Sequence, residues 1–404
     1  MVIIVRKNIR YGGAELLIER MANSLLNIGK ECKILCNNIS EIMAERCRSS
    51  NIEVIISQKW ISKKTINNLL ENNDVMFITT WAHDFILMDM FRYIWGNRFT
   101  LIHYVIAADD LCLGKSIPFC RKQFKEYYKI IIEKFHRNDC IVYMDYESIY
   151  KSENYYGLKL NNCFIVRLPY IVHKINLDKI KKRNDERKKK FTILSISRAE
   201  FPMKGYLLEL ISEFGQFYNR YPNSYLEIVT FGDGEKQLYE LYNKYGSDVK
   251  NHITIHGKLK YEELENIWNN ASLYVGLGTS ILDASDRGLC AIPVLQYSLE
   301  FKANKMFYEI PEQISADLNI EDNGYEIIDK VYNMTSDEYI SSAIMCYEAL
   351  KKYYDVDKAM DLLISKATRN NYVIKWSIFD YIMEKIFLKY DDYRFFKCHN
   401  PKGA

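Results

Sequence analysis

The sequence predicts an α/β protein built from two doubly wound, Rossmann-like domains. Short apolar runs alternate with amphipathic helical segments along most of the chain, and a charged stretch over 179–190 interrupts this alternation once. Strands separated by helices form parallel sheets covered by helices. A chain of 404 residues is also too long for one ordinary core. We therefore expect domains at 1–172 and 191–375, joined by a charged linker at 173–190.

The strands expected in the first domain are short apolar runs bounded by turn residues. A helix over Glu15–Ile28 follows the first of them, because its apolar residues recur at helical spacing. The expected strands are Val2–Val5, Glu31–Cys36, Ile52–Ile56, Asp74–Thr79, Phe99–Val105, Asp139–Tyr143 and Cys163–Val166.

The second domain repeats the alternation and then becomes wholly helical. Strands are expected at Phe191–Ser197, Tyr225–Phe231, His252–Ile255, Leu273–Val275 and Cys290–Leu295, with helices at Gly205–Tyr218, Glu235–Tyr245 and Tyr261–Asn270 between them. Later helices are expected at Glu338–Tyr354, Val356–Asn370 and Trp376–Tyr390. The last is rich in aromatic residues, so we expect residues 376–404 to be a crossover helix and tail that pack on the first domain.

Composition excludes several classes of protein. The net charge of +3 gives no overall affinity for polyanions, and the charged stretch lacks the interleaved aromatic residues of a nucleic-acid patch. No apolar run approaches the roughly 20 residues of a membrane-spanning helix, and Val2–Val5 is too short for the core of a signal peptide. The ten cysteines are therefore expected to be reduced, and the scattered histidines suggest no metal site. We expect a cytoplasmic protein.

Four features of the second domain follow strand ends. Arg198 directly follows an apolar strand, and Lys204 precedes the next helix. Gly232-Asp233-Gly234 follows the second strand, where glycines allow tight turns and close backbone approach. The fourth feature is the stretch Gly276–Asp283, a glycine turn that leads into a helix starting at Thr279 or Ser280.

Together these features predict a diphosphate site. Ligands of doubly wound sheets bind at the carboxyl ends of the strands. A helix that starts in a glycine loop presents unpaired N–H groups and a positive dipole end to an anion. Arginine suits bidentate contact with phosphate, and lysine acts as a point charge. Singly, Arg198 and Lys204 could be solvated surface charges, but their joint position at strand ends favours the site.

The chain resembles the family 4 glycosyltransferases, which have the GT-B fold. That family has a Gly-Gly-Ala-Glu loop after the first strand, and the present chain has Gly12-Gly13-Ala14-Glu15. The family's second domain carries an Arg, a Lys-Gly pair, a Gly-x-Gly turn and a Glu-Gly-x-Gly…Glu-Ala segment. These correspond to Arg198, Lys204-Gly205, Gly232-Asp233-Gly234 and the segment Val275–Ala284, which is followed by a Gly288–Val294 stretch similar to the family's next strand.

The resemblance implies a role for each matched residue. Arg198 and Lys204 would contact the diphosphate of a nucleotide-sugar donor, with UDP the first candidate nucleotide. The loop and helix start would add backbone donors, and Asp283 would hydrogen-bond the ribose. The family uses neither a divalent metal nor a further cofactor, and it retains anomeric configuration. The residues expected to bind the donor are Gly12, Gly13, Gly232, Gly278, Thr279, Ser280, Ile281, Leu282 and Asp283.

Val275 departs from the family, which has a glutamate that contacts the donor hexose at this position. Valine cannot accept a hydrogen bond. Hexose recognition then comes from elsewhere, or the donor differs, or activity is impaired. Alternatively, Val275 is simply a buried strand residue.

The family often places a histidine or carboxylate near the donor's reactive carbon, after a strand of the first domain. Here His103 and Asp109 are the candidates, with Asp110 beside them. His103 could equally be a core histidine, and Asp109 a helix N-cap. Trp81 and Asp84 could shape the acceptor site, although Asp84 could also cap a helix.

The segment Arg121–Arg137 is a basic amphipathic helix with an apolar face of Phe124, Tyr128, Ile131 and Phe135. Such a helix can lie on an anionic membrane. More commonly the apolar face is part of the core.

The expected function is that of a retaining glycosyltransferase that moves a hexose-type sugar from a UDP donor. The acceptor would be a glycan or a lipid-linked molecule in surface polysaccharide biosynthesis. The alternative is a non-catalytic nucleotide-binding subunit that partners an active glycosyltransferase. A dinucleotide-dependent oxidoreductase is disfavoured, because no Gly-x-Gly-x-x-Gly follows the first strand.

Overall fold

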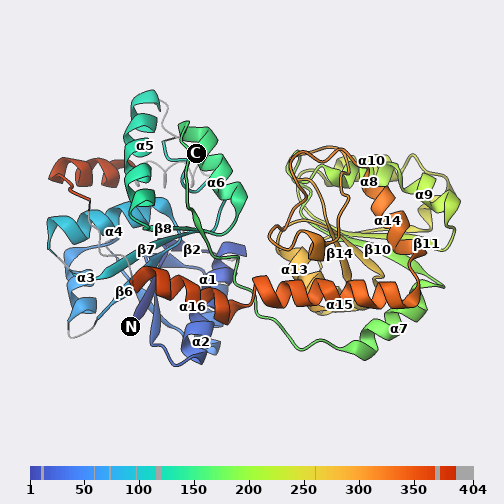
Figure 1. Ribbon diagram of the computed structural model, residues 1–404, viewed down its shortest axis with the longest axis horizontal. Helices are drawn as coiled ribbons and strands as arrows, with labels where there is room; N and C mark the ends of the chain where they lie inside the picture. Colours follow the sequence, from blue (N-terminus) through green and yellow to red (C-terminus); the bar gives the residue numbers. More distant parts are fainter. Residues whose placement is uncertain are drawn as a thin grey trace. The chain divides into compact units, whose positions relative to one another are not determined.

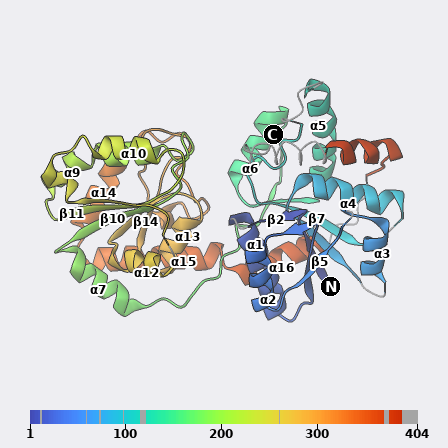
Figure 2. The ribbon, with the colours of Figure 1, turned by 180° about the vertical axis from the view of Figure 1, so that it is seen from behind.

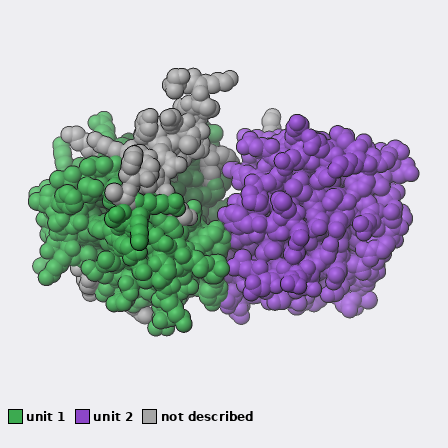
Figure 3. Space-filling view, turned by 90° about the horizontal axis from the view of Figure 1, so that it is seen from above, with its two compact units in different colours: residues 1–171, 355–404 green, residues 172–354 purple. Residues whose placement is uncertain are grey.

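The computed structural model describes residues 1–10, 13–58, 60–71, 74–96, 98–114, 121–259, 261–368 and 374–387. The chain divides into two compact units, shown in Figure 3: Met1–Ile171 together with Asp355–Ala404, and Val172–Tyr354. Each unit contains a parallel sheet covered by helices (Figure 1). The predicted fold class, two doubly wound α/β domains, is confirmed.

The first unit is built on a seven-stranded parallel sheet in the order β5-β3-β1-β6-β7-β8-β9. Its strands are β1 (Val2–Val5), β3 (Cys32–Cys36), β5 (Glu53–Ile56), β6 (Met76–Thr79), β7 (Thr100–Val105), β8 (Ile141–Tyr143) and β9 (Phe164–Ile165). A separate parallel pair joins β2 (Asn8–Ile9) to β4 (Asn38–Ile39). Its labelled helices are α1 (Gly13–Asn27), α2 (Glu41–Ser49), α3 (Lys63–Leu70), α4 (Ala82–Ile94), α5 (Arg121–Arg137), α6 (Tyr146–Tyr156) and α16 (Val356–Thr368).

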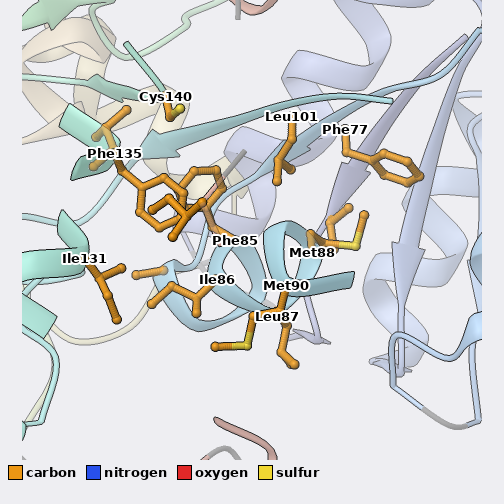
Figure 4. Close-up of a cluster of buried hydrophobic side chains, with 14 of the residues drawn as sticks. Phe77, Phe85, Ile86, Leu87, Met88, Met90, Leu101, Ile131, Phe135 and Cys140 are labelled. Atoms are coloured by element: carbon orange, nitrogen blue, oxygen red, sulfur yellow. The ribbon is translucent and has the colours of Figure 1, made fainter. Parts of the chain in front are cut away.

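The core of the first unit lies between the sheet and helices α4 and α5. Every residue of α4 from Ala82 to Arg92 is buried. This burial explains why apolar residues occur on all sides of the helix. Figure 4 shows Phe85 of α4 close to Phe135 of α5, and their ring centroids lie 4.4 Å apart. This packing fixes α4 and α5 on the sheet.

The expected basic helix forms as α5, but its apolar face is core. Tyr128, Ile131 and Phe135 are buried, and Phe124 packs edge-on against Phe387 with 4.6 Å between ring centroids. The interpretation that this apolar face lies on a membrane is therefore wrong, because the face is already covered by protein.

The second unit is built on a five-stranded parallel sheet in the order β12-β11-β10-β13-β14. In Figures 1 and 2, α8, α9, α10 and α14 cover one face of this sheet, and α7, α12, α13 and α15 cover the other. Its strands are β10 (Phe191–Ile196), β11 (Ser224–Val229), β12 (Ile253–His256), β13 (Leu273–Gly276) and β14 (Cys290–Pro293). Its helices are α7 (Leu177–Arg187), α8 (Tyr206–Ser212), α9 (Phe214–Arg220), α10 (Glu235–Tyr242), α11 (Ser247–Lys250), α12 (Tyr261–Asn270), α13 (Thr279–Asp286), α14 (Gly324–Asn333) and α15 (Ser336–Tyr353), with a 3₁₀ turn at Phe307–Glu309.

The segment expected as a charged linker is part of the second unit. It contains α7, whose N-cap Asn176 accepts a hydrogen bond from the backbone N–H of Lys179. Buried Arg183 donates to the carbonyls of Arg287 and Gly288 at the end of α13, and buried Arg187 donates to the carbonyls of Val331 and Met334 near the end of α14. These arginines satisfy helix-end acceptors, which a count of charges cannot reveal.

The chain also returns to the first unit earlier than expected, at Asp355 instead of at residue 376. The whole of α16 belongs to the first unit, where Ser24 of α1 donates to Asp357 over 2.6 Å. Residues 374–387 follow on the same unit: the indole N–H of Trp376 donates to buried Asp89 over 2.8 Å, and a further helix spans 378–387.

Among the residues that the structure describes, no helix is both long and apolar enough to span a membrane.

Candidate functional site

The candidate site of the second unit lies where its strand order reverses. β10 is central, and the chain moves from it to β11 on one side and later to β13 on the other. Loops from two such neighbouring strands run apart over opposite faces of the sheet and leave a crevice at the carboxyl ends. The loops after β10 and β13 carry Arg198, Lys204 and Gly278, so the topology brings these three features to the same edge.

Arg198 is an exposed cation at this edge. Its side chain is 53% accessible and lies 3.5 Å from a carboxylate oxygen of Glu200. Its guanidinium stands over the ring of Phe231, with 5.5 Å to the centroid. An ion pair this exposed stabilises the protein little, so the guanidinium can exchange Glu200 for an anionic ligand at small cost.

Lys204 is a partly buried cation on the same loop. Burial lowers the pKa of its ammonium group from 10.5; the negative charge of Glu200 opposes this effect, and the positive charge of Arg198 adds to it. Its backbone N–H donates to the carbonyl of Glu200 over 2.9 Å. An anion that binds beside such a buried lysine stabilises the charged form of its side chain.

The loop that carries these cations is held by its neighbours. The backbone N–H of Ala199 donates to Phe231, and that of Tyr297 donates to Met203, each over 2.9 Å. A Cβ at Gly205 would stand 2.6 Å from the carbonyl oxygen of Ser298, so only glycine allows this approach. Gly232 adopts a φ of +127°, which explains the glycine in the expected turn.

The start of α13 has the geometry of an anion site. Gly278, its N-cap, has φ 77° and ψ −152°, a conformation essentially restricted to glycine, and it provides no side-chain cap. Its own N–H donates to the carbonyl of Ile314 over 2.7 Å. The helix runs over Thr279–Asp286, so the first N–H groups point out of its N-terminus.

The side chains in the first turn of α13 differ in burial. Ile281 and Leu282 are buried, so they can offer only backbone groups to a ligand. The hydroxyl of Ser280 donates to the carbonyl of Leu277 over 3.0 Å. Asp283 is partly exposed one turn further on. The expected donor-binding residues from Gly278 to Asp283 therefore form one continuous helix start.

Val275 is a buried strand residue. It lies within β13, faces Ile292 of β14 in the register, and is fully inaccessible to solvent. The strand runs on through Gly276, so the position that resembles the family's hexose-binding glutamate is inside the sheet. Its side chain cannot contact a ligand, and hexose recognition at this position is excluded.

His103 is likewise a core residue. It lies on β7, is fully buried, and stacks on Phe85 with 5.2 Å between centroids. Its Nδ1 is 3.1 Å from the Thr79 hydroxyl and its Nε2 is 2.8 Å from Asp110. Both ring nitrogens are occupied, so the expectation that His103 reaches a substrate is wrong.

Asp109 and Asp110 differ in exposure. Asp109 is exposed after the end of β7, whereas Asp110 accepts from His103 and from the backbone N–H of Ala82, the first residue of α4. Asp109 therefore remains the candidate carboxylate of this loop for binding a ligand.

Asp84 neither caps α4 nor lines an acceptor site. It is fully buried in the first turn, where it accepts from the indole N–H of Trp60 over 2.8 Å and from the backbone N–H of Lys7 over 3.1 Å. Burial raises its pKa to about 6, and these hydrogen bonds oppose the rise. Trp81 takes the N-cap position of α4 without a side-chain hydrogen bond.

The structure describes Gly13, one of the two glycines expected to bind the donor in the first loop, but Gly12 lies outside the described residues. Gly13 begins α1, is exposed, and has no atom within 4 Å of where a Cβ would stand.

Sequence reasoning did not single out Phe231 and Lys258. Phe231 is 39% exposed, and its ring centroid lies 5.5 Å from the guanidinium of Arg198 and 5.9 Å from the ammonium of Lys258. Lys258 follows β12 by two residues, so the rule that located Arg198 would also have found it.

The fold is similar to that of several solved structures. HepE from Anabaena in complex with UDP matches with a TM-score of 0.64, at 11% identity over 91% of this chain and 99% of that chain. A glycosyltransferase from Rickettsia africae gives 0.60, at 13% identity over 91% and 97%. Sucrose-phosphate synthase from Thermosynechococcus elongatus gives 0.54, at 14% identity over 91% and 98%.

No protein-family model and no curated protein sequence matches the chain. At identities of 11–14% the structural likeness establishes the fold alone. The matches cover 91% of this chain, and each unit has the parallel sheet and helical layers described above. The chain therefore has the GT-B fold of two Rossmann-like domains.

Proposed function

We propose that this protein is a glycosyltransferase that takes a hexose-type sugar from a nucleoside diphosphate donor, with UDP the first candidate nucleotide. The observation that carries the proposal is the position of Arg198, Lys204 and the start of α13 at the reversal of strand order. The similar HepE structure contains UDP, which supports UDP as the first nucleotide to test.

The proposed chemistry uses charge stabilisation. Cleavage of the bond between sugar and diphosphate leaves negative charge on the departing phosphate. Arg198 can bind two of its oxygens, Lys204 can place a point charge beside it, and the N–H groups at Thr279 and Ser280 can donate to it. Donors arranged in advance for developing charge commonly supply the largest part of catalysis. The leaving phosphate itself can accept the acceptor's proton, so no enzymic base is needed.

The finer assignments follow from the resemblance to family 4. Asp283 would hydrogen-bond the ribose, and Gly232 would let the backbone approach the nucleotide. Transfer would retain anomeric configuration. The acceptor would be a glycan or lipid-linked molecule of surface polysaccharide biosynthesis, with Asp109 the exposed carboxylate nearest the end of β7.

A second candidate is a nucleotide-binding subunit without transfer activity. The burial of Val275 and His103 favours it, because these two positions would otherwise supply contacts to the sugar. Such a protein would bind UDP but would neither hydrolyse nor transfer the sugar.

A screen of nucleotides and nucleotide sugars separates these cases. Thermal unfolding with UDP, GDP and ADP would identify the nucleotide, since a ligand of the folded state raises the melting temperature. Mass analysis of reactions with the matching sugar nucleotides and glycan acceptors would detect the product. Failure of all three nucleotides to bind would overturn the proposal. Binding without turnover in the presence of acceptors would favour the second candidate.

A further inference from the structure

The exposed face of the helix over 378–387 is wholly apolar. Ile378, Phe379, Ile382 and Ile386 are 67%, 68%, 50% and 52% exposed. Three of them are spaced four residues apart and Phe379 adjoins them, so they form one stripe along the helix. A helix at the surface of a water-soluble protein ordinarily presents polar residues on this face. We call these four residues the apolar stripe.

The opposite face fastens this helix to the first unit. Glu384 is buried, pairs with His83 of α4, and accepts from the hydroxyl of Tyr128 of α5 over 3.0 Å. The hydroxyl of Tyr127 donates to Asp380 over 3.1 Å. In Figures 1 and 2 the helix, coloured red, lies on α4 beside α5. The apolar stripe is thus presented by a helix that is fixed on the core.

Two lysines adjoin the apolar stripe in the sequence, one before the helix and one within it. Lys375 is exposed just before the helix. The ammonium of Lys385 donates to the carbonyl of Trp60 over 2.6 Å, and the exposed Lys63 and Lys64 follow Trp60 in the chain, in the first turn of α3.

The neighbouring helix α5 adds to this charge. It carries six lysines and arginines against two glutamates. The exposed cations of α5 are Arg121, Lys122, Lys134 and Arg137. Positive charge therefore predominates on α5, one of the two helices on which this helix packs.

The geometry points to an anionic lipid surface as the partner of the apolar stripe. Interfacial helices bury an apolar face among acyl chains while nearby lysines and arginines attract anionic headgroups. A second copy of the chain fits less well. In a two-fold pair of identical faces, the lysines beside the apolar stripe would meet those of the other copy. This inference does not depend on the donor site.

Vesicle sedimentation tests the inference with the full chain. Vesicles of phosphatidylglycerol and phosphatidylcholine in equal parts should bind the protein, and vesicles of phosphatidylcholine alone should bind it more weakly. The double variant Phe379→Asp/Ile382→Asp should lose about tenfold or more in affinity, because it places charge where apolar surface must be buried. Leu362→Asp on α16, at a residue 49% exposed, is the matched control and should bind like the wild type.

Three results would overturn the inference: no binding of the wild type to the anionic vesicles, equal loss in Leu362→Asp, or a dimer that the double variant dissociates in sedimentation velocity. The melting temperature without ligand should be the same in the double variant as in the wild type, which shows that the variant is folded whether or not UDP binds. A loss of vesicle binding in a folded variant therefore tests this inference separately from the proposed donor site.

Discussion

The backbone N–H of Gly234 donates to the carbonyl of Ala199 over 2.9 Å, and this hydrogen bond ties the loop after β11 to the loop that carries Arg198 and Lys204. A Cβ at Gly234 would stand 2.8 Å from the same carbonyl oxygen and would overlap the ring of Phe201. The two loops can therefore meet only because this residue has no side chain.

Gly234→Ala should weaken both folding and nucleotide binding. The added methyl must push Ala199 or Phe201 away, which costs about 1–3 kcal/mol of the free energy of unfolding. The displaced loop should also lower the affinity for UDP. Denaturant unfolding and calorimetric titration with UDP measure the two effects.

Gly246→Ala is the matched control in the same unit. Gly246 has φ −70° and no atom within 4 Å of where its Cβ would stand. Alanine there should change the free energy of unfolding by less than about 1 kcal/mol, because restriction of the unfolded chain offsets the weaker N-cap of α11. Equal losses in the two variants would show that close packing at Gly234 is not the cause.

Val275→Glu should destabilise the protein and should not create a sugar contact. The side chain is fully buried in β13, so glutamate would place an unpaired carboxyl group in the core. The expected loss is about 3 kcal/mol or more in the free energy of unfolding. Leu318→Glu, at an exposed residue of the same unit, should change little. A stable Val275→Glu variant with stronger binding of sugar nucleotides would contradict the position given to this residue.

The affinity for UDP should fall at alkaline pH. Burial lowers the pKa of Lys204 below 10.5, so its charge is lost as pH rises through the lowered value. Binding of the diphosphate should raise this pKa again, so binding takes up protons in the window between the two values.

Lys204→Arg is the control for this titration. A guanidinium stays charged over the whole window, so this variant should lack the component of the pH dependence that comes from Lys204. Titration of UDP itself appears in both proteins and cancels in the comparison. Identical pH profiles for the wild type and Lys204→Arg would show that Lys204 does not bind the phosphate.

Stability should depend on pH through Asp84. Its pKa is about 6 in the folded protein, against an ordinary 3.8, because burial disfavours the charged form. The contribution to stability is complete below about pH 4 and is lost as pH rises through about 6. Two pKa units correspond to on the order of 3 kcal/mol.

Asp84→Asn removes this titration. The free energy of unfolding of Asp84→Asn minus that of the wild type should rise between pH 4 and 6, whatever the variant's absolute stability. Urea unfolding at several pH values measures the difference. A difference that stays constant with pH would show that Asp84 does not titrate in this range.

The alternation of strands and helices was enough to predict the fold. Expected strands such as Val2–Val5 and Phe191–Ser197 form within a residue or two of their predicted bounds, because buried parallel strands read as continuous apolar runs. Arg198 and Gly278 could be located for the same reason, since a residue that follows such a strand must lie at the carboxyl edge of the sheet.

What the sequence could not show depends on contacts between distant residues. His103 is a core residue because Thr79 and Asp110 occupy its two nitrogens. The segment 173–190 is structural because Arg183 and Arg187 bond helix ends more than a hundred residues away. Val275 could be matched to a motif, but only the strand register shows that it is buried. Local pattern carries no information about such partners.

The central claim is that Arg198, Lys204 and the start of α13 bind the diphosphate of a nucleotide donor. Calorimetric titration with UDP of the wild type, Lys204→Ala and Lys236→Ala tests it most directly. Lys236 lies on α10 with its side chain 87% exposed, so its loss should leave the affinity unchanged. Lys204→Ala should lose about 1.5–3 kcal/mol, roughly 10- to 150-fold in affinity. Equal affinities of UDP for Lys204→Ala and the wild type would contradict the claim.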